Sequence, residues 1–455
     1  MDTSALLGNL QTHFKLEPAN ARLLIVGLGA TGYSAAQFLQ NTPIKFAVID
    51  SRRNPPRIDS LREQMPDVPV FSGGFDQSAF DVATHLLVSP GVSLNEKAIH
   101  KAMQAGVTVL SDIDLFACAT DKPIIAITGS NGKSTVTTML GDMGNAAGIK
   151  TAIGGNLGTP ALDLLQQEAD LYVLELSSFQ LERTTALNAK AATVLNLSAD
   201  HLDRHDGMAG YAHEKQRIFR GDGAMILNAD DPAVMAMRDN HRTCFSFSVQ
   251  QTADFYLKCG GEVEQLMMGN AVLMNADELN LEGSHNIANA LAALALGHAA
   301  GMDMNAMCRA LKKFKGLPHR MQKVAEIAGV RWVNDSKATN IGACIAALQG
   351  YSRKVILIAG GDGKGADMAE LAPIIKDKTK AVILMGKDAP LIDQALNNCV
   401  PTHFAGNMKE AVKMAAGLAA TGDSVLLSPA CASLDQYKSY ADRGNKFAEA
   451  VLELI

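Results

Sequence analysis

The chain has 455 residues, of which 47% are hydrophobic and 19% are charged, and its formal net charge is −6. This length is too great for a single hydrophobic core and predicts about three domains. The composition is that of a globular protein, and the acidic balance argues against a broad nucleic-acid-binding surface.

Residues 1–14 lack the basic segment and apolar core of a signal peptide, and no run of about 20 apolar residues predicts a membrane span. Seven cysteines are scattered along the chain without a CxxC pair, so we expect buried free thiols in a reducing compartment. We therefore expect a cytoplasmic monomer that neither inserts into a membrane nor binds nucleic acid.

Apolar runs alternate with helical patterns along the whole chain, which predicts parallel α/β architecture. In the first part, strands are expected over residues 22–26, 45–50 and 84–89, with a helix beginning near Thr31. In the second, strands are expected over 124–128, 171–176, 193–197 and 224–227, then a small β segment within 250–281 and a helix over 284–300. In the third, strands are expected over 331–334, 355–359, 381–385 and 424–427. We predict an α/β protein of three domains, over residues 1–111, 112–316 and 317–455, with KGLPHR as the turn into the last.

A glycine-rich loop, VGLGATG, follows the first expected strand. It places Gly27, Gly29 and Gly32 in a GxGxxG pattern before a helix, and Asp50 ends the next strand. This arrangement is typical of NAD-binding sites, but the pattern alone is weak, and the same geometry can bind any pyrophosphate at a helix N-terminus. A second glycine turn, SPG at residues 89–91, is expected to contribute to the same site.

The segment TGSNGKST, residues 128–135, lies between a strand and a helix and predicts a phosphate-binding loop. Gly129 and Gly132 allow backbone N–H groups to turn toward phosphate oxygens, and the helix N-terminus adds positive potential. Lys133 would reach the β- and γ-phosphates, and the Ser134 hydroxyl would bind Mg²⁺. The segment departs from GxxxxGK[ST] at its first position, which is Ile127.

Candidate metal ligands follow two of the central strands. Glu175 ends the strand LYVLEL, where an α/β sheet places ligand contacts, and with Ser134 it would suit one Mg²⁺. His201 lies in SADHLD, where the sequence alone equally favours a loop histidine, since histidine is an unusual Mg²⁺ ligand. The neighbouring Asp200 and Asp203 either share a metal or are solvated.

Several further segments carry a resemblance to a known family: GGNLGTPAL, ELSSFQLE, NLSADHLDRH, GSHNIANALAA, GLPHRMQ, NDSKATN, GGDGKGAD and LLSPACASLDQY. Together with the phosphate loop they resemble the Mur ligases and the related folylpolyglutamate synthetase, in order and over essentially the whole chain. NDSKATN and SPACASLDQY are most similar to the D-glutamate-adding members. The resemblance implies an N-terminal Rossmann-like UDP-binding domain, a central P-loop ATPase domain and a C-terminal Rossmann-like domain.

The resemblance also assigns residues to each ligand. For ATP it implies Gly129, Ser130, Asn131, Gly132, Lys133, Ser134, Thr135, Asn289, Arg320 and Asp335. For the UDP-linked substrate it implies Gly29, Thr31, Asp50, Ser51, Ser89, Gly91 and Asn156. For D-glutamate it implies Lys337, Thr339, Lys364, Ser433 and Tyr440, the last being commonly Phe in the family. Asn286, one helical turn before Asn289, is either a further ATP contact or a helix cap.

Two Mg²⁺ ions are implied as well, held by Ser134, Glu175, His201 and Lys215, and the implied catalytic residues are Lys133, His201, Lys215 and Arg320. In the family, the lysine matching Lys215 is carbamylated by CO₂, which turns a cation into a carboxylate-like ligand. Nothing in the spacing around Lys215 shows this, and an ordinary solvated helix lysine is the alternative.

The implied reaction activates the carboxylate of UDP-N-acetylmuramoyl-L-alanine with ATP as an acyl phosphate, which the amine of D-glutamate then attacks in peptidoglycan precursor synthesis. The alternatives are another amino-acid-adding Mur ligase or a folylpolyglutamate synthetase, an NAD-dependent oxidoreductase using the GxGxxG loop, and a nucleotide-binding regulator without turnover. ATP and D-glutamate contacts fall on different domains, so closure of the third domain is a further hypothesis.

Overall fold

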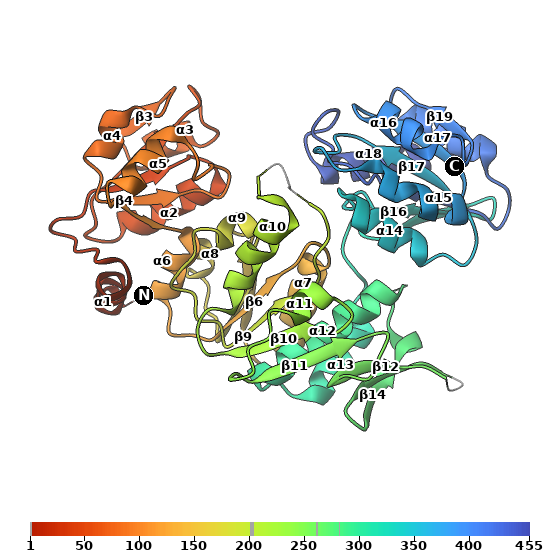
Figure 1. Cartoon of the computed structure of the whole chain (residues 1–455), viewed down its shortest axis with the longest axis horizontal. Helices are drawn as coiled ribbons and strands as arrows, with labels where there is room; N and C mark the ends of the chain where they lie inside the picture. The colour runs from red at the N-terminus through yellow and green to blue at the C-terminus, as the bar shows by residue number, and fades with distance from the viewer. Residues whose placement is uncertain (1, 201–203, 261–262, 282) are drawn as a thin grey trace.

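The computed structural model describes residues 2–200, 204–260, 263–281 and 283–455, and in this part of the chain the strands form three separate sheets (Figure 1). In Figure 1 the first sheet and its helices run from red to orange, the central ones from orange through yellow to green, and the last ones from teal to blue. We call the three parts the N-terminal, central and C-terminal units. The architecture is therefore the predicted three-part α/β fold.

The N-terminal unit contains a five-stranded parallel sheet in the order β3-β2-β1-β4-β5. Its strands are β1 Leu23–Val26, β2 Phe46–Asp50, β3 Val70–Ser72, β4 His85–Val88 and β5 Thr108–Leu110. Its helices are α1 Thr3–Phe14, α2 Ala30–Gln40, α3 Ile58–Gln64, α4 Gln77–Asp81 and α5 Lys97–Gln104. The chain runs outward in one direction from β1 to β3 and returns to β4 on the other side of β1. The carboxyl ends of β1 and β4 thus form the crevice where such sheets bind ligands.

The central unit contains a nine-stranded sheet in the order β14-β13-β12-β11-β10-β9-β6-β8-β7. Its strands are β6 Ile124–Thr128, β7 Thr151–Gly155, β8 Leu171–Glu175, β9 Ala191–Val194, β10 Ala224–Asn228, β11 Cys244–Ser248, β12 Phe255–Lys258, β13 Gln265–Met268 and β14 Ala271–Asn275. Its helices are α6 Asp112–Ala119, α7 Lys133–Ala146, α8 Ala161–Leu164, α9 Ser178–Leu181, α10 Gly207–Gln216, η1 Arg217–Phe219, α11 Pro232–Met235, η2 Ala276–Glu278, α12 Ser284–Ala300 and α13 Met304–Lys313. β12, β13 and β14 pair antiparallel at one edge, which confirms the predicted β segment within 250–281.

The C-terminal unit contains a six-stranded sheet in the order β15-β16-β20-β17-β18-β19. Its strands are β15 Gln322–Ile327, β16 Val330–Asn334, β17 Val355–Gly360, β18 Thr379–Met385, β19 Thr402–Phe404 and β20 Ser424–Leu427. Its helices are α14 Ile341–Gln349, η3 Met368–Leu371, α15 Ala372–Lys378, α16 Ala389–Leu396, α17 Met408–Leu418 and α18 Tyr440–Leu452. β15 pairs antiparallel with β16, whereas the other pairs are parallel. The carboxyl ends of β16, β17 and β20 lie together.

The three units differ in how they meet. One apolar cluster runs from α1 and the N-terminal sheet into α8 and the central strands, with Leu10, Ile25 and Leu162 among its members. The C-terminal sheet has its own two clusters, one on each face, built around Leu357 and Ile356. Since the N-terminal and central units share a core and the C-terminal unit does not, hinge motion is expected at the second junction.

The expected strands are all present, but one is misplaced. We expected a strand over 193–197, whereas β9 ends at Val194. The chain leaves the sheet there because the next residues bond the phosphate loop: Asn196 accepts from the backbone N–H groups of Ser130 and Asn131. The elements α1, β3, β5, β7, β11, β15 and β19 were not predicted. β3, β5, β7, β15 and β19 are edge strands, β11 is an interior strand with a partly exposed start, and α1 is a helix outside the alternating pattern.

Two further features bear on the sequence expectations. All seven cysteines are free, and Cys118, Cys308, Cys344 and Cys431 are buried, but Cys259 is exposed, so the expectation of buried thiols holds only in part. Among the helices in the described part of the chain, none combines the length and hydrophobicity that a bilayer crossing requires.

Candidate active site

The phosphate loop leaves β6 and enters α7, as the sequence predicted. Gly132 is the residue before the helix, with a left-handed φ of 84°. A Cβ atom on Gly132 would lie 2.3 Å from Asn289 Oδ1, so only glycine lets α12 come this close to the loop. Asn289 and Asn286 are buried on one face of α12, and Asn289 donates a hydrogen bond to Asn286 Oδ1. The loop and α12 therefore form one rigid cradle.

Lys133 lies at the centre of this cradle. Its Nζ donates to the backbone oxygens of Gly129 (2.8 Å) and Ser130 (3.0 Å). Burial lowers the pKa of Lys133, and the nearby Glu175 carboxylate partly offsets that effect. The ammonium is thus held by neutral carbonyls, which leaves it able to turn toward phosphate oxygens.

Glu175 ends β8 beside the loop and is only 2% exposed. Asn156 Nδ2 donates to Glu175 Oε1 at 2.7 Å, while Oε2 has no hydrogen-bond partner within the described residues. A buried carboxylate oxygen without a donor is costly, and a cation would remove that cost. Ser134 Oγ, buried at the start of α7, adds a second oxygen, so these residues fit a Mg²⁺ ion.

Asn156 is placed differently from the other residues assigned to the UDP-linked substrate. It follows β7 of the central unit and lies against Glu175, away from the glycine loop of the N-terminal unit. It therefore faces the phosphate loop end of the site.

Lys215 on α10 is 1% exposed and donates to Thr128 Oγ1 (3.3 Å) and Gly129 O (2.9 Å). Its Nζ lies 4.6 Å from the centre of the Tyr211 ring. Burial, with the like charge of Lys133 second, lowers the pKa of Lys215 well below the ordinary value. The alternative of an ordinary solvated helix lysine is therefore wrong, because the Lys215 side chain is buried, and burial shifts the amine toward its neutral, nucleophilic form.

His201 and Asp203 lie outside the described residues. Within the described ranges, no group of three or more His, Cys, Asp or Glu side chains is placed to hold a metal. A two-ion site therefore stays a prediction, and the fit of Glu175 and Ser134 concerns one ion.

A cavity of about 250 Å³ opens between the cradle and the C-terminal unit. Its lining includes Asn131, Gly132, Thr135, Asn286, Asn289, Arg320, Asp335 and Lys337. Arg320 comes from the turn between the units and donates to Ser134 Oγ at 3.1 Å. His319 and Met321 on either side have positive φ angles of 62° and 46°. The backbone of this turn is strained, and it directs Arg320 back toward the phosphate loop.

Asp335 follows β16 and faces the same cavity. Its Oδ2 accepts from Ser428 Oγ (3.0 Å) and its Oδ1 from the Met321 backbone N–H (3.3 Å). Burial raises the pKa of Asp335 to about 7, although both hydrogen bonds oppose this rise. The carboxyl group therefore titrates near neutral pH.

The residues assigned to D-glutamate fall into three groups. Lys337 Nζ lies 3.8 Å from the centre of the Tyr440 ring, and burial lowers the pKa of Lys337 to about 8. Thr339 and Lys364 line a separate small cavity together with Asp200. Ser433 is buried in the turn that follows β20. The structure does not bring these five into one pocket.

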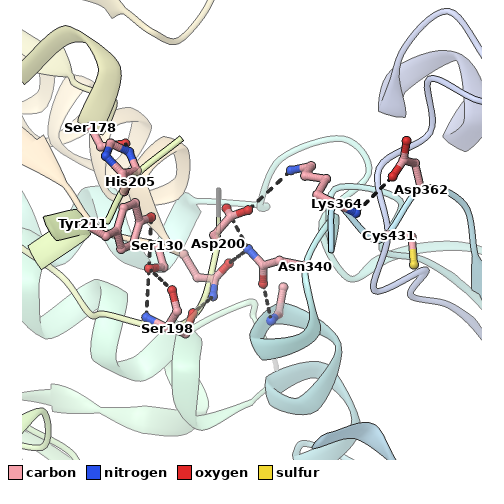
Figure 2. Close-up of polar contacts among 12 residues, drawn as sticks. Ser130, Ser178, Ser198, Asp200, His205, Tyr211, Asn340, Asp362, Lys364 and Cys431 are labelled. Atoms are coloured by element: carbon pink, nitrogen blue, oxygen red, sulfur yellow. Dashed lines mark hydrogen bonds and ion pairs between the residues drawn. The ribbon is translucent and has the colours of Figure 1, made fainter. Parts of the chain in front are cut away.

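Figure 2 shows how the second group meets the central unit. Asp200 projects from the segment after β9 toward Lys364, whose Nζ lies 3.4 Å from Asp200 Oδ1. Asn340 Nδ2 donates to Asp200 Oδ2 (3.3 Å) and to Asn131 Oδ1 (3.4 Å). The C-terminal unit thus contacts the central unit through polar side chains at the site.

A second cavity, of about 380 Å³, lies at the carboxyl ends of β1, β2 and β4. It is lined by six of the residues assigned to the UDP-linked substrate: Gly29, Thr31, Asp50, Ser51, Ser89 and Gly91. Ser89 Oγ donates to Gly27 O at 2.9 Å, which joins the two glycine turns. A Cβ on Gly32 would lie 1.9 Å from Gly27 O, so glycine is required where α2 crosses the loop.

Sequence reasoning missed Arg52 in this cavity. Arg52 Nη2 lies 2.6 Å from Asp50 Oδ2, and its Nε donates to Asp50 Oδ1. Burial raises the pKa of Asp50, but the hydrogen bonds from the Arg52 side chain and from the backbone N–H groups of Leu28 and Arg52 together outweigh it, and the pKa is lowered. The signal was present, since SRR follows the strand that Asp50 ends. Asp50 is therefore paired with Arg52 at the edge of this cavity.

Three family models match the chain. They are described as "Mur ligase MurD-like, N-terminal domain" over residues 21–111, "Mur ligase middle domain" over 127–297 and "Mur ligase, glutamate ligase domain" over 319–431. The matches cover the GxGxxG turn, the phosphate loop and the strand ends of the C-terminal unit.

Several relatives named UDP-N-acetylmuramoylalanine–D-glutamate ligase are similar over nearly their whole length. The protein from Methylococcus capsulatus is 53% identical over 436 residues, covering 95% of this chain and 95% of the relative. The one from Marinobacter nauticus is 50% identical over 438 residues, covering 95% and 98%. The one from Pseudomonas aeruginosa is 50% identical over 440 residues, also covering 95% and 98%.

Solved structures share the fold at lower identity. A pseudomurein peptide ligase type C from Methanothermus fervidus has a TM-score of 0.65 at 18% identity, covering 96% of this chain and 100% of that one. MurF from Acinetobacter baumannii has a TM-score of 0.62 at 17% identity, covering 98% of each chain. These likenesses establish the three-domain architecture.

Proposed function

The chain belongs to the Mur ligase family, and on that basis we propose that it joins D-glutamate to UDP-N-acetylmuramoyl-L-alanine with ATP, in peptidoglycan precursor synthesis. The observation that carries this proposal is the identity of about 50%, over nearly the whole chain, to relatives named for that reaction. As a member of this family it is an ATP-dependent ligase, so the oxidoreductase alternative is not retained.

We propose that the three domains divide at residues 111/112 and 316/317, and that the protein acts as a cytoplasmic monomer. The cavity in the N-terminal unit would hold the UDP moiety, and the cavity beside the phosphate loop would hold ATP. The alanine carboxylate would then lie between them, near Lys133 and Glu175. In this arrangement, the UDP end of the substrate lies in the N-terminal unit and its carboxylate reaches the central unit, which binds ATP.

In the proposed reaction, an oxygen of the alanine carboxylate bonds to the γ-phosphorus of ATP while the bond to ADP breaks. The amine of D-glutamate then bonds to the acyl carbon, phosphate leaves, and the amine loses a proton. Lys133 and Arg320 would balance the negative charge on the transferring phosphoryl oxygens, because both cations face the loop. Lys337 and Lys364 would hold the carboxylates of D-glutamate.

Glu175 and Ser134 would hold one Mg²⁺, which supplies positive charge to the phosphate oxygens when bound. A second ion, with His201 and a carbamylated Lys215 as ligands, is part of the same proposal. The burial and lowered pKa of Lys215 support carbamylation, because only the neutral amine reacts with CO₂. Asn289 would contact the adenine, and Asp335 the ribose hydroxyls.

Phosphate release from ATP tests the function directly. The assay supplies UDP-N-acetylmuramoyl-L-alanine with D-glutamate, L-glutamate, L-lysine or meso-diaminopimelate in separate reactions. We expect release with D-glutamate alone. Release with another amino acid instead would make the protein a sister ligase, and no release with any of them would refute the proposal.

A further inference from the structure

Arg183 connects the central unit to the N-terminal unit. α9 lies on the side of the central unit that faces the N-terminal unit (Figure 1). Arg183 follows α9 by two residues, and its side chain is fully buried. Its Nη1 lies within hydrogen-bond distance of three backbone oxygens of the N-terminal unit, those of Val88 (3.2 Å), Ser89 (2.8 Å) and Val92 (3.1 Å). One guanidinium nitrogen thus contacts three backbone carbonyls at the end of β4 and in the turn that follows it.

The turn that Arg183 holds forms one wall of the N-terminal cavity. Ser89 and Val92 line that cavity, and Ser89 Oγ donates to Gly27 O in the first glycine turn. Val92 also packs on Gly27, since a Cβ there would lie 3.0 Å from Val92 Cγ2. Fixing this turn therefore fixes the place at which the diphosphate would bind.

The other end of the same segment carries Glu175, eight residues earlier. Between them, Ser177 and Gln180 form a capping box at the start of α9. After Arg183, the backbone N–H groups of Thr185 and Ala186 both donate to Asp114 Oδ1 at 2.7 Å. These hydrogen bonds hold the segment between Glu175 and Arg183 in one conformation, so the position of one residue relative to the other is fixed.

The charge of Arg183 is balanced locally. Its Nη2 lies 2.7 Å from Glu182 Oε2, and the Glu182 side chain keeps 22% of its surface exposed. The planar guanidinium contacts Glu182 through Nη2 and the turn through Nη1. A lysine ammonium has a single nitrogen for both contacts. The geometry needs arginine for this double contact.

From these contacts we infer that Arg183 is a positioning residue that sets the span between the UDP-binding turn and the phosphate-transfer centre. The inference rests on the proposed function, because the distance between the UDP-binding turn and the phosphate loop matters only if one substrate binds at both. A UDP-linked acyl donor anchored at its diphosphate presents its carboxylate at a distance fixed by the protein. A misplacement of about 1 Å can cost about 100-fold in rate.

The inference predicts a specific division of effects in Arg183→Lys. The N-terminal turn keeps its own bonds to Gly27, so the inhibition constant of free UDP and the KM for ATP should change less than about threefold. Misalignment should instead lower kcat by about 10-fold or more. Arg242→Lys is the matched control, because Arg242 donates to the backbone oxygens of Phe219 and Gly223 within the central unit, outside this segment, and all its constants should stay within about twofold of wild type.

A milder variant covers the case in which Arg183→Lys fails to fold. Glu182→Gln keeps the arginine but removes the charge that orients Nη2, and it should lower kcat by about threefold with UDP inhibition unchanged. An unaltered kcat in the Arg183 and Glu182 variants would overturn the inference. An equal loss of UDP affinity would also overturn it, since Arg183 would then only shape the turn. If wild-type protein releases no phosphate with the proposed substrates, the proposed function fails and the inference falls with it.

Discussion

Lys364 of the C-terminal unit and Asp200 of the central unit form an ion pair, with Lys364 Nζ 3.4 Å from Asp200 Oδ1. Both side chains are largely shielded from water, with 25% and 13% of their surfaces exposed. The lysine proposed to bind a D-glutamate carboxylate thus already has a carboxylate partner from the other unit. Binding of D-glutamate would exchange one anion for another on Lys364, and Asp200 would keep the hydrogen bond from Asn340 Nδ2.

Replacement of Lys364 by Gln should raise the KM for D-glutamate by about 10-fold or more, which corresponds to about 1.4 kcal/mol. The KM for ATP should change less than about twofold, because the ATP cavity does not include Lys364. Steady-state phosphate release measures both constants. Lys387→Gln is the control, since Lys387 pairs with Asp362 in the same region but is 60% exposed. Equal effects of the two variants would contradict the assignment.

Replacement of Glu175 by Gln should lower activity while the protein stays folded. The change keeps the shape of the side chain and an oxygen that can accept from Asn156 Nδ2. It removes a proposed Mg²⁺ ligand, so kcat should fall by about 100-fold or more. Phosphate release with Mg²⁺ measures this loss, and thermal unfolding without Mg²⁺ checks that the variant is folded. A folded variant with the kcat of wild type would contradict the proposed role of Glu175.

The stability of the C-terminal unit should depend on the ionisation of Asp335. Its pKa is about 7 in the folded protein and about 3.9 in an unfolded chain, so between these values the folded state binds more protons. This contribution to stability is complete below pH 4 and is lost as the pH rises through about 7. Asp335→Asn cannot titrate and should lack the effect.

The single tryptophan makes that prediction measurable. Trp332 lies buried in β16, three residues before Asp335, so its fluorescence reports unfolding of the C-terminal unit. Urea titrations at several pH values give the free energy of unfolding of wild type relative to Asp335→Asn. This difference should fall as the pH rises from 5 to 8. Parallel pH profiles for the two proteins would place the pKa of Asp335 outside this window.

Lys215 should become carbamylated at neutral pH. Burial lowers the pKa of its amine well below that of an exposed lysine, which increases the fraction of neutral amine that can react with CO₂. With ¹³C-bicarbonate, wild-type protein should show a carbamate resonance that Lys215→Arg lacks, and that variant should lose about 100-fold or more in kcat. Lys190→Arg, at a more exposed lysine that donates to Ala300 O, should retain the resonance. A wild-type spectrum without the resonance, with full activity, would contradict the proposal.

The parallel strands and the phosphate loop were predictable because their signals are local. A buried strand such as β6 is a continuous apolar run, and the glycines and lysine that follow it have few other uses in that order. The edge strands β3 and β19 are three residues long and partly exposed, so they lack such a run. The end of β9 was mispredicted because a tertiary contact, Asn196 with the phosphate loop, takes the chain out of the sheet.

Only those residues of the candidate site that lie in local sequence motifs were predictable. The residues around both glycine loops lie together as expected, since each follows a strand of one sheet. Arg183 was missed because its contacts span more than 90 residues, from the central unit to the N-terminal turn. The pairing of Lys364 with Asp200 depends on how two units meet, which no local pattern encodes.

Exchange of whole domains between related enzymes would meet an obstacle at Arg183. By sequence, this arginine belongs to the central unit, but it donates to three carbonyls of the N-terminal unit. A chimaera joined at residue 111 would pair a foreign N-terminal domain with an arginine fitted to a different turn. A junction that also transfers residues 177–186 and their partner Asp114 would keep these contacts together. The unit that recombines intact is therefore discontinuous in the chain.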